Sequence, residues 1–336
     1  MIRAAIVGLG WWGKTLVRGA KASGRIQIVA GATGRRELAE EFAREQGFRL
    51  ANSFEDVLAD PAVQAVILAT PHLDHESQVI GAAQAGKHVF CEKPFTLSKA
   101  SAERAVAAMS EASLTLGLGH NRRFHPNVAE LRRRQRAGEL GTILHGEGTM
   151  TAPNGLFLKP ESWRVDPQQS PAGGMAGLGI HMVDGLIDLL GPIEAVAAQS
   201  LHRAVPTGAE DTTSMLLRFK RGPTGYVSCM TATAPTYRLS LYGTKGVAEV
   251  RGRDHDQFTF WPTPDAPLGG HAAPKPVEAS SLPGFDTVAA ELSAFAEAVE
   301  RHEPFPIAPE DMVHCIAVYE AIVRSAAARG EWVSVA

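Results

Sequence analysis

Three glycines near the N-terminus have the spacing of a phosphate-binding turn. The run Gly8-Leu9-Gly10-Trp11-Trp12-Gly13 directly follows the apolar segment Ile2–Val7 and opens a segment with helical character. In that setting the glycines permit a tight turn, and a pyrophosphate can lie against the free N–H groups of the helix N-terminus. The motif predicts a dinucleotide site in which both tryptophans pack around the turn and offer their backbone N–H groups.

The residues after the second predicted strand indicate which dinucleotide is preferred. About twenty residues beyond the glycine turn, an NAD-selective site usually carries an acidic residue that binds the ribose hydroxyls. Here Thr33 stands at that place, and Arg35 and Arg36 follow. Two guanidinium groups can bind a 2′-phosphate by charge-assisted hydrogen bonds, and no carboxylate is present to repel it. The sequence favours NADP over NAD, unless both arginines are solvated residues of the next helix.

Short apolar runs alternate with helix-period segments around this motif, which predicts a parallel sheet covered by helices on both faces. We expect residues 1–121 to form a Rossmann NAD(P)-binding domain. Helices are predicted over 36–46, after Ser53, over 76–85 and over 98–110. The expected strands are Ile2–Val7, Ile26–Ala30, Val63–Ala69, His88–Cys91 and Leu114–Leu118.

Beyond residue 121 the pattern changes to one helix and then longer alternating segments with hairpin turns, which is typical of antiparallel sheet. The fold class is therefore α/β, with an α+β second domain over 122–336 that carries a large, mostly antiparallel sheet. A loop is expected over 261–283 and helices over 127–137, 287–300 and 309–328. The expected strands are 142–151, 195–202, 214–219, 226–231, 237–242 and 247–250.

The composition favours a small molecule as the partner. The chain has 336 residues, and its 33 Lys+Arg against 36 Asp+Glu leave a net charge of -3, which gives no reason to expect nucleic acid or a membrane. Cys91, Cys229 and Cys315 are too widely spaced for a disulfide framework or a metal site, and no metal is expected from the histidines. With no signal segment and no apolar span, we expect a cytoplasmic protein.

Five motifs resemble landmarks of the glucose-fructose oxidoreductase and inositol dehydrogenase (Gfo/Idh/MocA) family in order and spacing, over essentially the whole chain. The resemblance implies an open-faced sheet in the second domain that often forms oligomer interfaces, and hence a dimer or tetramer. It also implies sugars, polyols, cyclitols or related ring alcohols as substrates, oxidised at a secondary hydroxyl or reduced at the matching ketone. The motifs are Thr70-Pro71-His72-Leu73-Asp74-His75, Cys91-Glu92-Lys93-Pro94, Asn121–Pro126, Trp163-Arg164 and Gly179-Ile180-His181-Met182-Val183-Asp184.

The resemblance implies that Lys93 and His181 are the catalytic residues. Lysine can hold the substrate oxygen and favour its alkoxide-like state, and histidine can accept the hydroxyl proton at neutral pH as the hydride leaves. Taken singly, each could be an ordinary solvated or backbone-satisfied side chain, and only the joint occurrence of both motifs favours catalysis. The further cofactor contacts that it implies are Thr70, Pro71, His75, Glu92, Lys93, Trp163 and Arg164.

One position departs from the family pattern. Gly177 stands where the family usually has an aspartate that pairs with the histidine and the substrate. Asp184, one helical turn beyond the histidine, could orient it instead, or a water or substrate group could do the work of the acid. A glycine also enlarges the pocket, so a larger ring alcohol that bears a carboxylate is a candidate substrate, with Arg122, Arg123 or Lys159 as counter-charges.

Two other functions remain open at this stage. A redox-neutral lyase or glycosidase could retain the nicotinamide and use it transiently, and tight retention of the cofactor would favour that reading. A non-catalytic NAD(P)-sensing protein could use the same fold, but it would be expected to lack the Lys93 and His181 pair. Because fold alone does not define activity, the enzyme hypothesis depends on those two residues.

Overall fold

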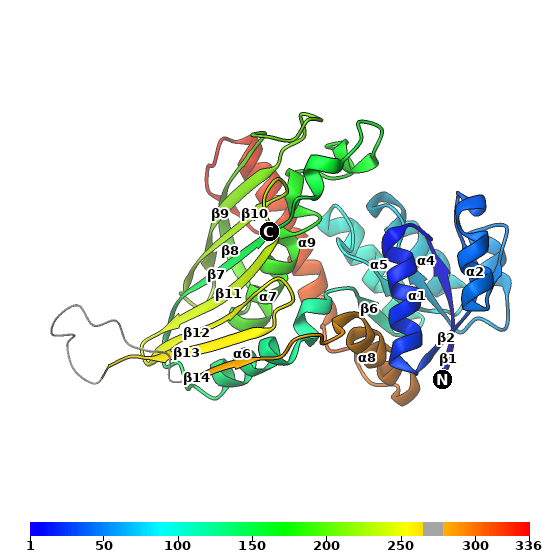
Figure 1. Cartoon of the computed structure of the whole chain (residues 1–336), viewed down its shortest axis with the longest axis horizontal. Coiled ribbons are helices and arrows are strands. Elements are labelled where there is room, and N and C mark those ends of the chain that lie inside the picture. The colour runs from blue at the N-terminus through cyan, green and yellow to red at the C-terminus, as the bar shows by residue number, and fades with distance from the viewer. Residues whose placement is uncertain (265–277) are drawn as a thin grey trace. The chain divides into compact units, whose positions relative to one another are not determined.

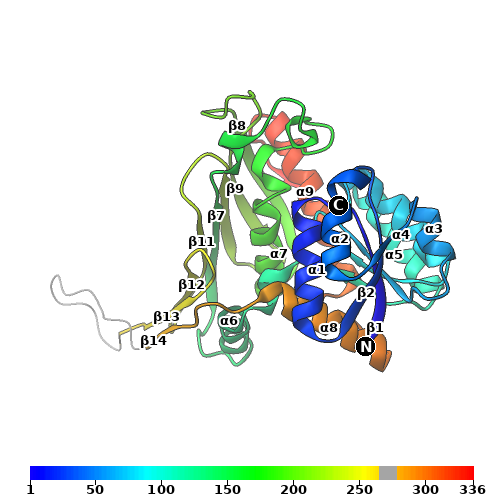
Figure 2. The ribbon, with the colours of Figure 1, turned by 45° about the vertical axis from the view of Figure 1, so that its right-hand side comes forward.

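The computed structural model describes residues 1–264 and 278–336, which form two compact units. The first unit contains residues 1–121 and 286–316, and the second contains 122–285 and 317–336. The segment 286–316 lies with the first unit because helix α8 (Thr287–Arg301) packs on α1 (Trp11–Ser23). Gly19 permits this close contact, since a Cβ atom there would lie 2.6 Å from Val288. Figures 1 and 2 show α1 and α8 side by side.

The first unit is built on a six-stranded parallel sheet in the order β3-β2-β1-β4-β5-β6. All five predicted strands form, and their residues are mostly buried, which explains their apolar composition. The short β3 was not expected, because two residues carry no periodic signal. The strands are β1 (Ile2–Val7), β2 (Ile26–Ala32), β3 (Arg49–Leu50), β4 (Ala65–Leu68), β5 (His88–Cys91) and β6 (Leu116–Leu118).

The helices of the first unit follow the predicted pattern with one interruption. The helix expected over 36–46 is divided at Ala39 into a 3₁₀ turn, η1 (Arg36–Leu38), and α2 (Glu40–Gln46), which ends at Gly47 with a φ of 78°. The helix predicted after Ser53 is α3 (Phe54–Ala59), and the Ser53 side chain caps it by accepting the Asp56 N–H at 3.1 Å. The remaining elements are η2 (His72–Asp74), α4 (His75–Gln84), α5 (Lys99–Glu111) and the first part of α9 (Pro309–Ala327).

The second unit contains a nine-stranded, mostly antiparallel sheet in which only β7 and β10 pair in parallel among the described strands. The predicted loop over 261–283 was partly wrong, because β13 and β14 extend into it, while 265–277 lies outside the described residues. The residues of β14 are Glu-Ala-Ser-Ser and all are exposed, so strand pairing and an ion pair of Glu278 with Arg134 define this strand instead of an apolar pattern. The strands are β7 (Ile143–Thr151), β8 (Ile193–Leu201), β9 (Thr212–Phe219), β10 (Thr224–Met230), β11 (Thr236–Gly243), β12 (Gly246–Arg251), β13 (Gln257–Pro262), β14 (Glu278–Ser281) and β15 (Val333–Ser334).

Helix α7 (Gly179–Leu190) lies along one face of this sheet, as the turned views show (Figures 1 and 2). Two glycines of β7 permit its close approach, because a Cβ atom at Gly146 would lie 2.7 Å from Leu190 and one at Gly148 would lie 2.9 Å from Met182. Eleven of its twelve residues are buried. The other helical elements are η3 (Asn121–Phe124), α6 (Pro126–Arg136), η4 (Asn154–Phe157), η5 (Trp163–Val165), η6 (Gly173–Met175) and the end of α9.

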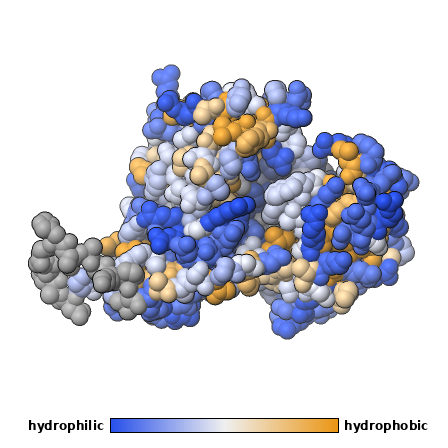
Figure 3. Space-filling model, viewed as in Figure 1, coloured by the Kyte–Doolittle hydropathy of each residue, from blue (hydrophilic) through white to orange (hydrophobic). Residues whose placement is uncertain are grey.

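The opposite face of the sheet is polar. Glu249 accepts hydrogen bonds from Ser240 at 2.9 Å and from Arg238 at 2.6 Å, and the Tyr242 hydroxyl donates to Glu147 at 3.0 Å. Hydrophilic residues dominate the surface over β11 and β12 in Figure 3. Among the described helices, none combines the length and the apolar character needed to cross a bilayer.

Candidate active site

The glycine turn between β1 and α1 has the geometry of a phosphate cradle. Gly8 has a φ of +92°, and a Cβ atom there would lie 2.5 Å from the Ala69 carbonyl oxygen, so only glycine fits. A Cβ atom at Gly13 would lie 1.9 Å from the Gly8 carbonyl oxygen, whereas one at Gly10 would project into open space. No side chain of the described residues caps the N-terminus of α1, which leaves its first N–H groups for a phosphate. These residues fit a dinucleotide.

The two arginines after β2 have different surroundings. The Arg36 guanidinium donates to the main-chain carbonyls of Ala51 at 3.1 Å and Leu50 at 3.4 Å, so the fold already holds it. The Arg35 side chain makes no hydrogen bond within the described residues and is exposed, while its backbone N–H lies 3.5 Å from Thr33 Oγ1. Of the two predicted ligands of a 2′-phosphate, Arg35 is therefore the available one, and both assignments stay predictions.

The residues after β4 hold the neighbouring loops together. The Thr70 hydroxyl donates to Gln78 at 2.6 Å, and Pro71 precedes the 3₁₀ turn η2. The His75 ring is fully buried, with Nδ1 3.0 Å from the Pro94 carbonyl oxygen and Nε2 3.2 Å from that of Thr70. Burial lowers the pKa of this histidine. His75 thus links the loops after β4 and β5, and its predicted contact with the cofactor stays a prediction.

Glu92 and Lys93 follow β5 at the carboxyl edge of the sheet. Glu92 is 4% exposed, and its Oε2 accepts the Lys93 N–H at 3.2 Å. A Cβ atom at Gly119 would lie 2.7 Å from Oε1, so the glycine makes room for this side chain. Burial raises the pKa of the Glu92 carboxyl to about 7, against the opposing effects of the Lys93 charge and the Trp12 indole. The Trp12 indole therefore acts on the carboxyl, but neither its Nε1 nor Glu92 Oε1 has a hydrogen bond of standard geometry within the described residues.

The predicted cofactor residues of the first unit therefore gather at one edge of its sheet. The glycine turn follows β1, Thr70 follows β4, and Lys93 follows β5, and these three strands are neighbours in the order β1-β4-β5. In a doubly wound sheet, ligands bind outside the carboxyl ends of the strands, where the strand order reverses. Trp11 is 76% exposed beside the turn, with its ring 5.3 Å from that of Trp12.

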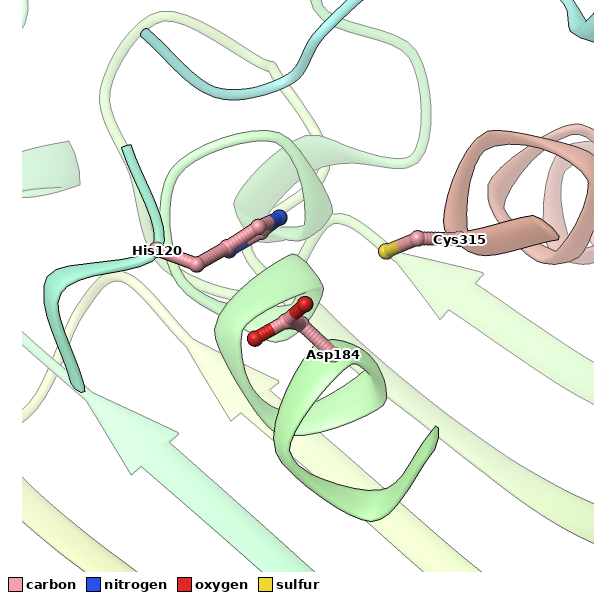
Figure 4. Close-up of side chains that lie close together, drawn as sticks. All are labelled: His120, Asp184 and Cys315. Carbon is pink, nitrogen blue, oxygen red and sulfur yellow. The ribbon is translucent and has the colours of Figure 1, made fainter. Parts of the chain in front are cut away.

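In the second unit, α7 carries the candidate base. His181 lies in the first turn of the helix and is 5% exposed, and its main-chain N–H donates to the Leu178 carbonyl at 3.1 Å. Asp184 projects from the same helix (Figure 4). Its two carboxylate oxygens accept hydrogen bonds from Arg123, at 2.8 Å from Nε and 2.7 Å from Nη2. The proposed orientation of His181 by Asp184 stays a prediction, but the carboxylate already has a bidentate cation as partner.

Figure 4 also labels His120 and Cys315, which come from the first unit. His120 follows β6 and Cys315 lies on α9, and each is 1% exposed. The sequence offered no role for either side chain, and their burial is consistent with structural positions.

The structure changes the list of candidate counter-charges for a substrate carboxylate. Arg123 is buried against Asp184, so it is not available to an anionic substrate. Lys159 is exposed and Arg122 is half-buried. The Arg164 guanidinium lies 4.3 Å above the Trp163 ring in a cation–π contact on η5. Arg122, Lys159, Trp163 and Arg164 keep their predicted roles as predictions.

Gly177 lies between η6 and α7 and has room for a side chain. Among the described residues, the nearest heavy atom that a Cβ atom at Gly177 would meet is the Gly174 carbonyl oxygen, at 4.0 Å. Its neighbour Gly179 is crowded, since a Cβ atom at that position would lie 2.3 Å from Met175 Sδ and 2.9 Å from Cys229 Sγ. The glycine at 177 is therefore not required by packing.

Sequence reasoning overlooked the charged network around α7. Asp188 lies one turn beyond Asp184, and its side chain, 7% exposed, binds Arg132 Nε at 2.6 Å and lies 3.4 Å from Arg123 Nη1. Two aspartates four residues apart in an otherwise apolar helix were a visible signal, because carboxylates on one buried helix face need cationic partners. Which arginines supply the charge depends on the tertiary fold.

Comparisons with known proteins agree with this fold. Residues 2–120 match the oxidoreductase family with an NAD-binding Rossmann fold, and 128–249 match the GFO/IDH/MocA C-terminal domain. The trans-1,2-dihydrobenzene-1,2-diol dehydrogenase of Mus musculus is 30% identical over 238 residues, 70% of each chain. The 2,7-anhydro-N-acetylneuraminate hydratase of Escherichia coli K12 is 32% identical over 260 residues, 74% of this chain and 68% of the relative.

Among solved structures, a levoglucosan dehydrogenase in complex with NADH and levoglucosan superimposes with a TM-score of 0.86 at 23% identity, covering 99% of each chain. The chain belongs to the Gfo/Idh/MocA oxidoreductase family, as the motifs indicated. It is an enzyme that uses NAD or NADP. The predicted α/β fold, with a Rossmann domain and a mostly antiparallel second sheet, is confirmed.

Proposed function

We propose that the protein transfers a hydride between the nicotinamide and a secondary alcohol or ketone carbon of a sugar, polyol, cyclitol or related ring alcohol. The observation that carries this proposal is the position of Lys93, which follows β5 at the same sheet edge as the glycine turn. The bound nicotinamide would accept or donate the hydride. The relatives named above support the proposal, since one acts on a cyclic diol and another binds levoglucosan.

In the direction of oxidation, Lys93 would hold the substrate oxygen and stabilise its developing negative charge. His181 would take the hydroxyl proton while the carbon–hydrogen bond breaks, so that one proton and one hydride leave and a carbonyl forms. A neutral imidazole can do this near pH 7, because the unperturbed pKa of histidine is about 6.5. Reduction would run through the same groups in reverse.

We further propose that NADP is preferred, because Arg35 is exposed and uncommitted and because Thr33, not an acidic residue, stands directly after β2. Arg35→Ala should weaken NADPH binding by roughly tenfold, the size of one lost charge-assisted hydrogen bond, and leave NADH binding unchanged. Arg36→Ala is the matched comparison, since the fold holds that side chain on main-chain carbonyls. Fluorescence titration with both nucleotides measures the difference, and equal effects of the two substitutions would argue against the assignment.

The substrate is proposed to be larger than a simple hexose, because Gly177 leaves space beside α7. Arg122 and Lys159 are the counter-charges we propose for a substrate carboxylate. A panel of ring alcohols with and without carboxylates tests this directly, and full activity on neutral sugars alone would contradict it. Gly177→Asp should fit without displacing the backbone and should narrow the accepted substrates.

The decisive experiment combines cofactor titration with turnover. Wild-type protein should bind NADPH and oxidise or reduce a member of the panel, and Lys93→Ala should lower kcat by about 10³-fold or more while cofactor binding persists. Two alternatives predict other results. Turnover of a substrate without net change in NADPH, with the nicotinamide retained through purification, would favour a redox-neutral reaction like that named for the hydratase relative. Binding without any turnover would favour a sensing protein.

A homo-oligomer assembled through the second sheet and a cytoplasmic location complete the proposal. The face of that sheet opposite α7 carries the Arg238 side chain, which is 47% exposed and donates to the buried Glu249 at 2.6 Å, and such hydrogen-bonded polar groups suit a polar interface. Light scattering coupled to gel filtration gives the mass in solution. A monomeric mass at micromolar concentration would contradict the proposed dimer or tetramer.

A further inference from the structure

Helix α7 buries two negative charges on one face. Asp184 and Asp188 lie one turn apart, and their side chains are only 3% and 7% exposed. Residues four apart in a helix project in nearly the same direction. Buried carboxylates are strongly unfavourable unless cations and hydrogen-bond donors meet them, so something in the fold must hold this face of the helix.

Arg123 contacts both carboxylates. It donates from Nε and Nη2 to the two oxygens of Asp184, at 2.8 and 2.7 Å, in a fork that fits a carboxylate, and its Nη1 lies 3.4 Å from Asp188 Oδ1. Arg132 of α6 binds the other oxygen of Asp188 at 2.6 Å and donates to the Arg123 main-chain carbonyl at 3.1 Å. Arg123 itself is 5% exposed on its side chain.

Two anchors one turn apart restrict a helix more than a single anchor does. A rotation of α7 by one residue turns its face by about 100°, and a slide of one turn moves it about 5.4 Å, and either motion would break the fork on Asp184. His181 lies three residues before Asp184, so both side chains occupy the same side of the helix. The anchored helix is therefore the one that presents the candidate base.

We propose that Arg123 is a positioning residue, which fixes the rotation and height of α7 and so holds His181 where hydride transfer requires it. The catalytic part of this inference rests on the proposed function, whereas the anchoring of α7 does not. Reacting groups must be placed to within fractions of an ångström, and a displacement of about 1 Å can cost about 100-fold in rate.

The test compares Arg123→Met with Arg134→Met. Arg134 is also a buried, ion-paired arginine of the second unit, but its partners lie outside α7: it binds Glu130 at 2.6 Å and is stacked on Phe258. Both variants are studied at a temperature where each is folded. The measurements are amide hydrogen exchange of α7 peptides, the Kd for NADPH and kcat.

Arg123→Met should speed exchange in α7 by about tenfold or more and lower kcat by about 10- to 100-fold, with an unchanged Kd for NADPH. Arg134→Met should change neither exchange in α7 nor kcat. Arg123→Lys keeps one charge but loses the fork, so it should recover part of kcat, and it carries the test if the methionine variant does not fold.

Three results would overturn the inference. Equal acceleration of α7 exchange in both methionine variants would mean general destabilisation. Faster exchange with unchanged kcat would reduce Arg123 to a structural residue. Unchanged exchange and kcat in both Arg123 variants would show that Arg123 does not anchor α7. If wild-type protein turns over no substrate, the proposed function fails, and the exchange comparison alone then decides whether Arg123 anchors the helix.

Discussion

The two units treat a buried carboxylate in opposite ways. In the second unit, Asp184 is enclosed by a bidentate arginine, so its charge is compensated within the fold. In the first unit, Glu92 accepts the Lys93 N–H at 3.2 Å, and its Oε1 has no hydrogen bond of standard geometry within the described residues, so burial outweighs the nearby Lys93 charge and Trp12 indole. A satisfied network makes a helix rigid, whereas an unsatisfied buried group at the predicted cofactor edge is unstable by itself and available to a ligand.

Arg123→Met should give the largest change in the free energy of unfolding, because it removes the cation that compensates Asp184. The substitution leaves two buried carboxylates with too few cations, and the loss of one partner of a buried pair typically costs about 3–5 kcal/mol. Urea unfolding monitored on a second-unit probe measures it. A loss below about 1 kcal/mol would show that water reaches these carboxylates, and would remove the contrast with Glu92.

Glu92→Gln should act in the opposite direction and stabilise the protein at alkaline pH. Burial raises the pKa of Glu92 from 4.5 to about 7, so the folded chain binds more protons than the unfolded chain between these values. The contribution of Glu92 to the free energy of unfolding therefore falls as the pH rises from 4.5 to 7, and it stays low above pH 7. The variant should gain up to about 3 kcal/mol at pH 8 and show a flatter pH profile. Destabilisation of the variant at pH 8 would show that the carboxylate is satisfied after all.

His255 is a buried group of the second unit whose charged form has no compensating partner in the described part of the chain, in contrast to Asp184. His255 is 1% exposed, neither ring nitrogen has a hydrogen bond of standard geometry within the described residues, and the centroids of its ring and the Tyr237 ring lie 3.9 Å apart. Burial and the charges of Arg122 and His125 lower its pKa to about 2, while the Asp254 main chain opposes this.

The unfolded chain therefore binds the extra proton below pH 6.5, so stability from His255 is present above that pH and is lost as the pH falls. At pH 5 the loss should reach about 2 kcal/mol. His255→Asn tolerates the φ of 60° and should flatten this acid limb in thermal melts. An unchanged slope in the variant would assign the acid sensitivity to other groups.

The smallest effect is expected at the surface. Arg133 pairs with Glu130 at 2.7 Å and Glu139 at 2.6 Å, but its side chain is 52% exposed. Exposed pairs contribute about 0–1 kcal/mol because water screens them. Arg133→Ala should therefore change stability by less than about 1 kcal/mol, and most of that change should vanish in 0.5 M salt. A loss as large as that of Arg123→Met would mean that burial is not what distinguishes these ion pairs.

Much of the fold could be predicted from local patterns. The five strands of the first sheet are continuous apolar runs, and Gly8 and Gly13 are glycines for reasons that the strand-turn-helix context already indicates. The assignment of 286–316 to the first unit could not be predicted, because it depends on α8 meeting α1 across more than 250 residues of sequence. The polar strand β14 likewise has no signal of its own.

By itself the sequence determined the family, the dinucleotide turn and the two candidate catalytic residues, because each depends on residue type at short spacing. Only the tertiary structure decided which charged side chains are available to bind a ligand. Arg36 and Arg123 look like available cations in the sequence, yet one is held on main-chain carbonyls and the other on Asp184. Glu92 looks like an ordinary carboxylate, yet burial raises its pKa to about 7. Charge is a property of a residue, but its compensation depends on neighbours that are distant in the chain.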